Sequence, residues 1–248
     1  MKQIIFIYTA IANFIYKLFL FSVFCSVYTS QLNAQETAPS VLSNYIKIKS
    51  VSGHEKPAAL FMKKLCEDFG FHIKVFSDSD SSYNFSASIL PLDKKLPSVL
   101  LINHLDVVPV SDSLQWKFPP YEGKIDHDTI YGRGSIDMKG LAVMQVFALK
   151  KIKETIHLDS LRYNFTILFL SGEETGGLKG AKLMIHPNVI AQLNPVVVFG
   201  EGGGGLTGVI PNKEKDLCFF VSNAENKSGW IKLEATVKSH GHGSVPSA

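Results

Sequence analysis

The chain has 248 residues, of which 46% are hydrophobic and 19% charged, and its formal net charge at pH 7 is +3. This composition is typical of a globular protein, and the length suffices for one large domain or slightly more. The small positive charge, without a stripe of Lys and Arg, argues against a nucleic-acid-binding surface. The cysteines, Cys25, Cys66 and Cys218, are too few and too scattered for a disulfide framework or a thiolate metal site.

The first 35 residues are predicted to be a separate segment. Residues 4–15 and 18–27 are strongly apolar, and small and polar residues follow at 30–36. A basic residue, an apolar run and a small-residue boundary are typical of a secretory signal peptide. We therefore expect cleavage near Ala34 or Gln35 and an exported protein, periplasmic or secreted. An uncleaved N-terminal membrane anchor is the alternative.

Two helices and two strands are predicted in the first part of the mature chain. Pro57 favours the start of the second helix and Gly70 its end. A loop rich in Ser and Asp, at 77–82, separates the two strands. The expected elements are helices at 37–49 and 58–69 and strands at 72–76 and 86–90.

Three continuous apolar runs, at 98–102, 164–170 and 195–199, are predicted to be strands buried on both faces of a parallel sheet. Acidic or imidazole side chains follow each run within a few residues. A helix at 140–152 is apolar on nearly all sides and is therefore expected to be buried. A short helix at 180–185 and an ordered loop at 116–121 complete this part of the chain.

These elements predict an α/β fold, with a mostly parallel sheet flanked by helices. Ligands bind beyond the carboxyl ends of the strands in such sheets. After Gly208 the pattern changes, and 230–238 alternates like a strand with one exposed face. One strand cannot bury a core, so residues 229–248 are expected to begin a smaller α+β domain that is cut short. The domain at 36–228 is expected to be incomplete as well.

His104 is the first candidate metal ligand. It follows the first buried strand, and Glu201 follows the third. Imidazole nitrogen and carboxylate oxygen together suit a borderline divalent cation. Asp106, two residues after His104, is better placed to orient the ring through its other nitrogen than to bind the same ion. By itself, His104 would more often be an ordinary buried or surface histidine, but the acidic residues at matching strand ends favour a metal ligand.

Asp137 is the second candidate. It lies in a glycine-flanked turn, 132–140, that enters a predicted helix. One carboxylate can bridge two ions through its two oxygen atoms. The alternative is a helix-capping aspartate, but capping does not explain the adjoining Gly-Arg-Gly.

Glu173 and Glu174 are two adjacent carboxylates after the second buried strand. Such a pair suits a division of roles, with one as metal ligand and the other as general base. The alternative is a solvated acidic turn, and the position between a buried strand and a Gly-Gly pair argues against it.

The motifs resemble those of the di-zinc metallopeptidases. This family includes carboxypeptidase S, glutamate carboxypeptidase, aminoacylases, acetylornithine deacetylase and succinyl-diaminopimelate desuccinylase. The resemblance spans residue 41 to the C-terminus in consistent order, and segments 116–123 and 224–227 are most similar to the carboxypeptidase S branch. The four motifs occupy 104–109, 132–140, 173–177 and 201–203.

The resemblance implies a ligand set for two zinc ions. His104 and Glu201 would bind one zinc, Glu174 the other, and Asp137 would bridge both. The second zinc also needs a histidine from the C-terminal region of the family, which this sequence does not reach. We therefore expect a C-terminally truncated chain with an incomplete second site.

The resemblance also implies catalytic roles. Glu173 would be the general base, Asp106 would orient His104, and the peptide bond after Asp137 is often cis in this family. The smaller domain carries a Gly-His loop, matched here at 241–246, whose His242 would hold the substrate or the oxyanion. That domain often forms a homodimer, so a homodimer is the expected assembly.

The predicted function is zinc-dependent hydrolysis, by metal-activated water, of peptide or N-acyl amide bonds in small substrates with a free carboxylate. Small peptides and N-acyl amino acids are the expected substrates. Two alternatives remain at this point. One is a di-zinc aminopeptidase of another family, and the other is an inactive fragment or a non-catalytic remnant that keeps the fold.

Overall fold

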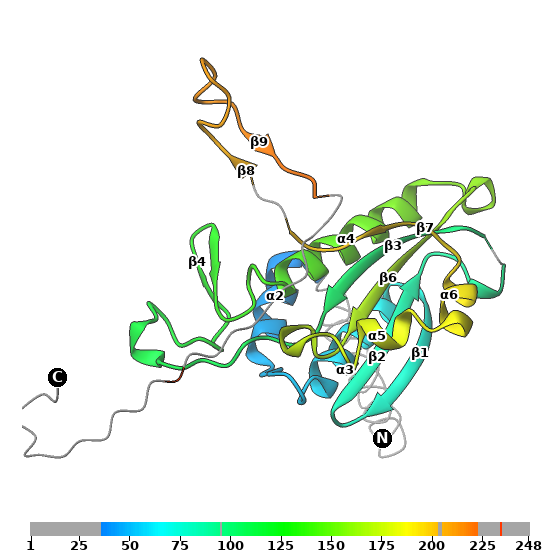
Figure 1. Ribbon diagram of the computed structural model, residues 1–248, viewed down its shortest axis with the longest axis horizontal. Helices are drawn as coiled ribbons and strands as arrows, with labels where there is room; N and C mark the ends of the chain where they lie inside the picture. The colour runs from blue at the N-terminus through cyan, green and yellow to red at the C-terminus, as the bar shows by residue number, and fades with distance from the viewer. Residues whose placement is uncertain (1–35, 95, 203–204, 223–233, 235–248) are drawn as a thin grey trace, which may run out of the picture. The chain divides into compact units, whose positions relative to one another are not determined.

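The computed structural model describes residues 36–94, 96–202, 205–222 and 234 (Figure 1). These residues fall into two compact units, the first ending at Glu201 and the second beginning at Gly202. The predicted signal segment and the boundary at 228/229 lie outside the described residues and stay predictions. Within the described part, no helix combines the length and the apolar character needed to cross a membrane.

The first unit is built on a sheet of five strands in the order β1-β2-β6-β3-β7. β6 pairs with β3 and β3 with β7 in parallel, whereas β1–β2 and β2–β6 are antiparallel. Four strands therefore point the same way and β2 runs against them, so the predicted α/β fold is confirmed with a mixed sheet. The strands are β1 His72–Ser79, β2 Ser82–Ser88, β3 Ser98–His104, β6 Asn164–Leu170 and β7 Pro195–Phe199.

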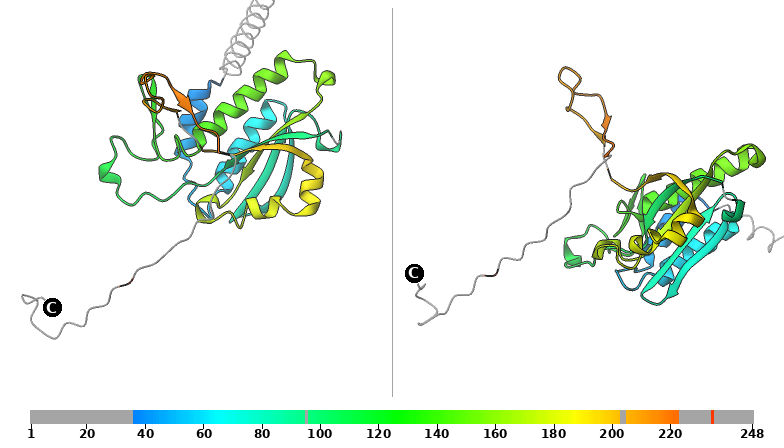
Figure 2. Two further views of the ribbon diagram at one scale, coloured as in Figure 1. Left: turned by 45° about the horizontal axis from the view of Figure 1, so that its top comes forward. Right: turned by 45° about the vertical axis from the view of Figure 1, so that its right-hand side comes forward.

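Helices cover both faces of this sheet. Figures 1 and 2 show α2, α3 and α4 on one side and α5 and α6 on the other. Short 3-10 turns, η1 Leu92–Lys94, η2 Ser113–Gln115 and η3 Leu158–Ser160, lie in the connections. The helices are α2 Ala38–Lys47, α3 Lys56–Asp68, α4 Lys139–Thr155, α5 Ala181–Met184 and α6 Pro187–Leu193.

Local signals set the ends of the first two helices. Thr37 caps α2, since its side chain accepts a hydrogen bond from the Ser40 amide. Pro57 lies in the first turn of α3, as predicted. Gly70, just past α3, has a φ of 71°, in the left-handed region that glycine adopts most readily after a helix.

Alternate residues of β6 supply two cores. Ile167 and Phe169 face the larger core, on the side of α2, α3 and α4, and Phe85 of β2 stacks on Phe169 at 4.6 Å between ring centroids. Leu168 and Leu170 face a smaller core that contains Met184 of α5 and Leu193 of α6. Both sides of β6 are buried, and burial of each large apolar side chain contributes about 1.5–3 kcal/mol.

Two burial predictions were wrong. β7 is the edge strand of the described sheet, and Val196, Val198 and Phe199 are 54%, 49% and 51% exposed. α4 buries only one side, since Met144 is 61% exposed. In both segments the composition is apolar all round, but neighbouring elements cover only part of the surface.

The connections also differ from prediction. The expected loop 77–82 is mostly strand, because β1 and β2 continue to a tight turn after Ser79. A hairpin of β4 Lys124–Asp126 and β5 Thr129–Tyr131 follows the ordered loop and was not predicted. The second unit contains a short antiparallel pair, β8 Gly205–Leu206 and β9 Cys218–Phe219.

Candidate metal centre

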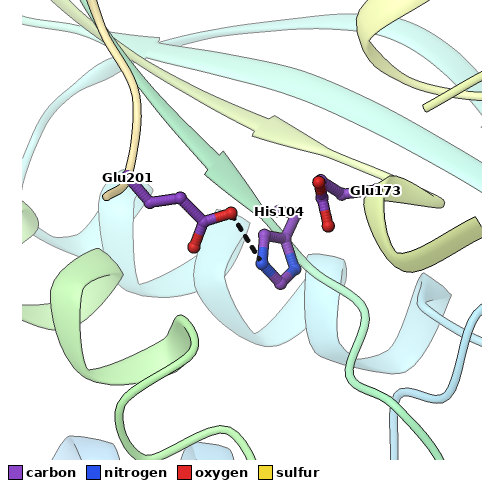
Figure 3. A group of neighbouring side chains, drawn as sticks. All are labelled: His104, Glu173 and Glu201. Atoms are coloured by element: carbon purple, nitrogen blue, oxygen red, sulfur yellow. Dashed lines mark ion pairs between the residues drawn. The ribbon is translucent and has the colours of Figure 1, made fainter. Parts of the chain in front are cut away.

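Three parallel strands deliver the candidate ligands to one edge of the sheet. His104 is the last residue of β3, Glu173 opens the 3-10 turn η4 Glu173–Thr175 after β6, and Glu201 follows β7. Figure 3 shows the three side chains around a common centre, each from a different strand end. The expected convergence at the carboxyl ends of the strands is therefore present.

Five predicted residues lie together at this edge. The Nε2 atom of His104 is 2.9 Å from Oδ1 of Asp137 and 3.3 Å from Oε1 of Glu201. Two overlapping groups, His104 with Glu173 and Glu201, and His104 with Asp137 and Glu174, each place their ligand atoms within 4.8 Å of one another. His104 belongs to both groups, so the same imidazole lies close to all four carboxylates.

The ring of His104 is held from behind by Asp106. Its Nδ1 atom is 2.9 Å from the backbone oxygen of Asp106 and 3.6 Å from the carboxylate atom Oδ1. Donation from Nδ1 to this carbonyl leaves Nε2 facing the acidic residues, where it is free to bind a metal ion. Asp106 therefore lies where orientation of the ring was predicted, with its carbonyl oxygen as the nearer partner.

The carboxylate of Asp106 is fully buried and binds other groups. It accepts hydrogen bonds from the Ser52 hydroxyl at 2.7 Å and from the backbone amides of Glu173 and Glu174 at 3.0 and 3.1 Å. Burial opposes ionisation, but hydrogen bonds from His104 and Ser52 outweigh it and lower the pKa of Asp106. Asp106 thus positions the imidazole mainly through its backbone carbonyl and the Glu173–Glu174 backbone through its carboxylate.

Asp137 reaches the site from a loop rather than from a strand. Helix α4 is capped by Met138 with no side-chain hydrogen bond from Asp137, which removes the capping alternative. The Asp137–Met138 peptide bond is cis, as the family resemblance implies. Gly134, at a φ of 83°, is packed so closely that a Cβ there would lie 2.7 Å from Val107, which accounts for the second glycine of Gly-Arg-Gly.

The electrostatics of the cluster favour a cation. Burial alone would lower the pKa of His104, but Asp106 and Glu201 raise it to about 10. Burial and then the Asp137 carboxylate raise the pKa of Glu174, while burial, Asp137 and Glu173 raise that of Glu201. Carboxylates that repel one another around an imidazole form a donor set that fits a divalent metal ion.

Sequence reasoning missed some residues of this site. Ser52 was not predicted to belong to the site, and the Met138 sulfur, which accepts the His104 backbone N–H at 3.0 Å, was not considered. Neither has a local pattern, because each contacts the site from a segment distant in sequence. The predicted substrate residue His242 lies outside the described residues.

Comparisons with known proteins agree with this arrangement. Residues 100–246 match peptidase family M20/M25/M40. Succinyl-diaminopimelate desuccinylase of Ehrlichia canis is 33% identical over 132 residues, covering 53% of this chain and 33% of that protein. Carboxypeptidase S of Saccharomyces cerevisiae is 33% identical over 166 residues, covering 62% of this chain and 27% of that protein. The chain thus spans about a third of the length of these relatives.

A solved structure shares the fold. The M20 family metallo-carboxypeptidase of Sulfolobus solfataricus superimposes with a TM-score of 0.58 and 26% sequence identity. The match covers 70% of this chain and 39% of that one. The sheet flanked by helices is therefore an architecture that this relative also has.

Proposed function

This chain belongs to peptidase family M20/M25/M40, and on that premise we propose that it carries the catalytic centre of a zinc-dependent hydrolase. The reaction is hydrolysis of a peptide or N-acyl amide bond in a small substrate with a free carboxylate. One observation carries the proposal: an imidazole and four carboxylates gather at the carboxyl ends of three parallel strands.

The proposed metal-binding roles are those that the family resemblance implies: His104 and Glu201 hold one zinc, Glu174 holds a second, and Asp137 bridges both. The proposal is supported by the distances from the His104 Nε2 atom, 2.9 Å to Asp137 and 3.3 Å to Glu201, and by the position of Glu174 in one ligand group with His104 and Asp137. When bound, the cations act as Lewis acids that polarise the substrate carbonyl and make water easier to deprotonate.

Glu173 is the proposed general base. Its side chain is exposed and lies in one ligand group with His104 and Glu201, and its backbone amide donates a hydrogen bond to Asp106. The carboxylate accepts a proton from the attacking water and returns it to the nitrogen of the leaving amine. Because Asp106 fixes the backbone of both glutamates, base and ligand keep a constant separation.

The replacement Glu173→Gln tests this assignment. We expect turnover of N-acyl amino acids and dipeptides to fall about 10²–10⁴-fold, because an amide cannot accept the proton. Bound zinc, measured by elemental analysis, should stay at the wild-type level. The control Glu154→Gln changes an exposed carboxylate that pairs with Lys150, and it should leave turnover unchanged. Undiminished turnover in the Glu173 variant would end the base assignment.

Two further measurements separate the alternatives. A requirement for a free C-terminal carboxylate supports this proposal, whereas a requirement for a free N-terminal amine supports a di-zinc aminopeptidase. Bound zinc without hydrolysis of any substrate supports a non-catalytic remnant. Export through the segment 1–35 and a homodimer through 229–248 remain parts of the proposal, to be tested by fractionation and by light scattering.

A further inference from the structure

A pocket of about 540 Å³ lies beside the candidate metal centre. Its wall comes from Leu42 of α2, from residues 116–118 and from residues 129–137, so that Asp137 forms part of the lining. Pockets of this size accommodate small organic ligands. A molecule seated here would lie against a proposed metal ligand.

Three aromatic rings form part of the wall. Phe118 and Tyr131 pack edge to face, with centroids 5.0 Å apart, and Trp116 lies in the same lining. The ammonium of Lys117 is already bound, at 3.2 Å to Asp126 and 3.3 Å to the Tyr131 hydroxyl. The charge of Lys117 is therefore compensated, and the pocket presents apolar surface with a second cation, Arg133.

Arg133 lacks such a partner. Its guanidinium carbon lies 5.0 Å from the centroid of the Trp116 ring, while its Nε atom is buried without a hydrogen-bond acceptor. Among the described residues, no carboxylate forms an ion pair with it. The Arg133 backbone is held by a hydrogen bond of 2.7 Å to the Pro120 carbonyl. The planar guanidinium of Arg133, with its N–H donors, thus lies in the pocket wall, and no carboxylate of the described residues pairs with its charge.

The hydrogen-bond donors of the Arg133 guanidinium indicate which kind of ligand this pocket would bind. A guanidinium offers parallel N–H donors that match the two oxygen atoms of a carboxylate. Stacking on the indole of Trp116 orients the plane of the donors. The surrounding rings suit an apolar group attached to that carboxylate.

We propose that Arg133 and its aromatic pocket bind the substrate's own carboxylate together with an apolar side chain on the same residue. This deepens the proposed function and rests on it: the preferred substrates are N-acyl or peptidyl amino acids with a large apolar C-terminal residue. Arg133 is then a specificity-determining residue next to the metal centre.

Binding of a matched pair of ligands tests the proposal without relying on turnover. N-acetyl-phenylalanine and its carboxamide differ only at the carboxylate, and calorimetry measures both against the purified protein with its metal. We expect the acid to bind about tenfold to a hundredfold more tightly than the amide. Equal affinity for the acid and the amide in the wild-type protein would overturn the proposal, and this comparison needs no variant.

Variants then assign the preference to one residue. Arg133→Met should abolish the preference for the acid, and Arg133→Lys, which keeps the charge but loses the planar fork, should retain part of it. Arg162→Met removes an exposed guanidinium elsewhere and should preserve the preference. A preference that persists in folded Arg133→Met, with the melting temperature as the check on folding, would place the carboxylate elsewhere. Arg133-dependent binding without hydrolysis would uphold the pocket while contradicting the proposed function.

Discussion

Single buried acids organise this site. The Asp106 carboxylate accepts hydrogen bonds from Ser52 and from two consecutive amides of η4, and its backbone oxygen contacts His104, so one residue joins three segments. Hydrogen bonds to a charged group contribute about 1.5–3 kcal/mol each. An acid of this kind is therefore both a stabilising group and the reference point for the catalytic geometry.

Glu55 is a second buried acid with a different environment. Its exposed fraction is 0%, and neither carboxyl oxygen has a hydrogen-bond partner. Burial raises the pKa of Glu55 and Asp106 raises it further, against the backbone amides of Gly53 and Gly172, which favour the ionised form. The fold thus favours the protonated carboxyl relative to the unfolded chain.

The variant Glu55→Gln should reveal this linkage. An acid whose pKa is raised on folding contributes stability below its unfolded pKa, and that contribution is lost as the pH rises through the folded pKa. The wild-type protein should therefore lose stability relative to Glu55→Gln as the pH rises above about 4, the ordinary range of a glutamate pKa. Urea unfolding at a series of pH values measures the difference.

A matched control isolates the effect of burial. Glu122→Gln makes the same change at an exposed position, and its stability difference from wild type should stay constant over this range. If the stability difference between wild type and Glu55→Gln were also independent of pH, the folded and unfolded states would have the same pKa for Glu55, and the prediction would be wrong.

At the scale of elements, the start of α4 is pinned to its neighbours. Lys139 is buried, and its ammonium donates to the carbonyls of Tyr45 and Ile48 at 3.0 and 2.7 Å, at the end of α2. These bonds satisfy carbonyl groups that a helix end leaves without partners. The turn that carries Asp137 is thereby fixed between two helices.

Gly140 provides a test of this close packing. A Cβ at this position would lie 2.2 Å from the carbonyl oxygen of Ser135. Alanine normally gains about 1 kcal/mol over glycine inside a helix, but here Ser135 and the Asp137 turn must move. We expect Gly140→Ala to lower the free energy of unfolding by about 1–3 kcal/mol and to weaken zinc binding.

The control for this change is Gly200→Ala, where an added Cβ meets no atom within 4 Å. Its stability should stay within about 0.5 kcal/mol of wild type. Thermal unfolding and zinc titration of both variants measure the two effects. Wild-type zinc affinity in Gly140→Ala would show that the Asp137 turn does not depend on this contact.

At the scale of the whole molecule, the metal count is the informative quantity. His104 is the imidazole of both ligand groups of the described residues, and its Nε2 atom can bind one ion: with Asp137 and Glu201 it offers three protein ligands, which leaves only carboxylates around Glu174. Catalytic zinc sites usually have three protein ligands. We predict that this 248-residue chain binds about one zinc tightly.

Elemental analysis after dialysis measures this stoichiometry. His104→Ala removes the only imidazole of both ligand groups within the described residues, so tight binding should disappear. Two tightly bound zinc ions per wild-type chain would contradict the prediction and indicate a further ligand, with His240 and His242 as the first residues to replace.

Local patterns were enough to predict much of this molecule. The apolar runs before His104, Glu173 and Glu201 predicted strands, and parallel strands bring their carboxyl ends to one edge of a sheet. Pro57 and Gly70 predicted the start and the end of the second helix, because a helix end is stabilised by residues within one turn of it.

Contacts between distant segments decided the rest. The exposure of β7, the reversed direction of β2 and the partnerless carboxyl of Glu55 depend on which elements lie alongside them. The hydrogen bonds from Glu173 and Glu174 to Asp106 join residues 67 and 68 positions apart. Hydrophobic periodicity reports which side chains avoid water, but only tertiary packing determines which neighbour covers each face and where a buried polar group finds a partner.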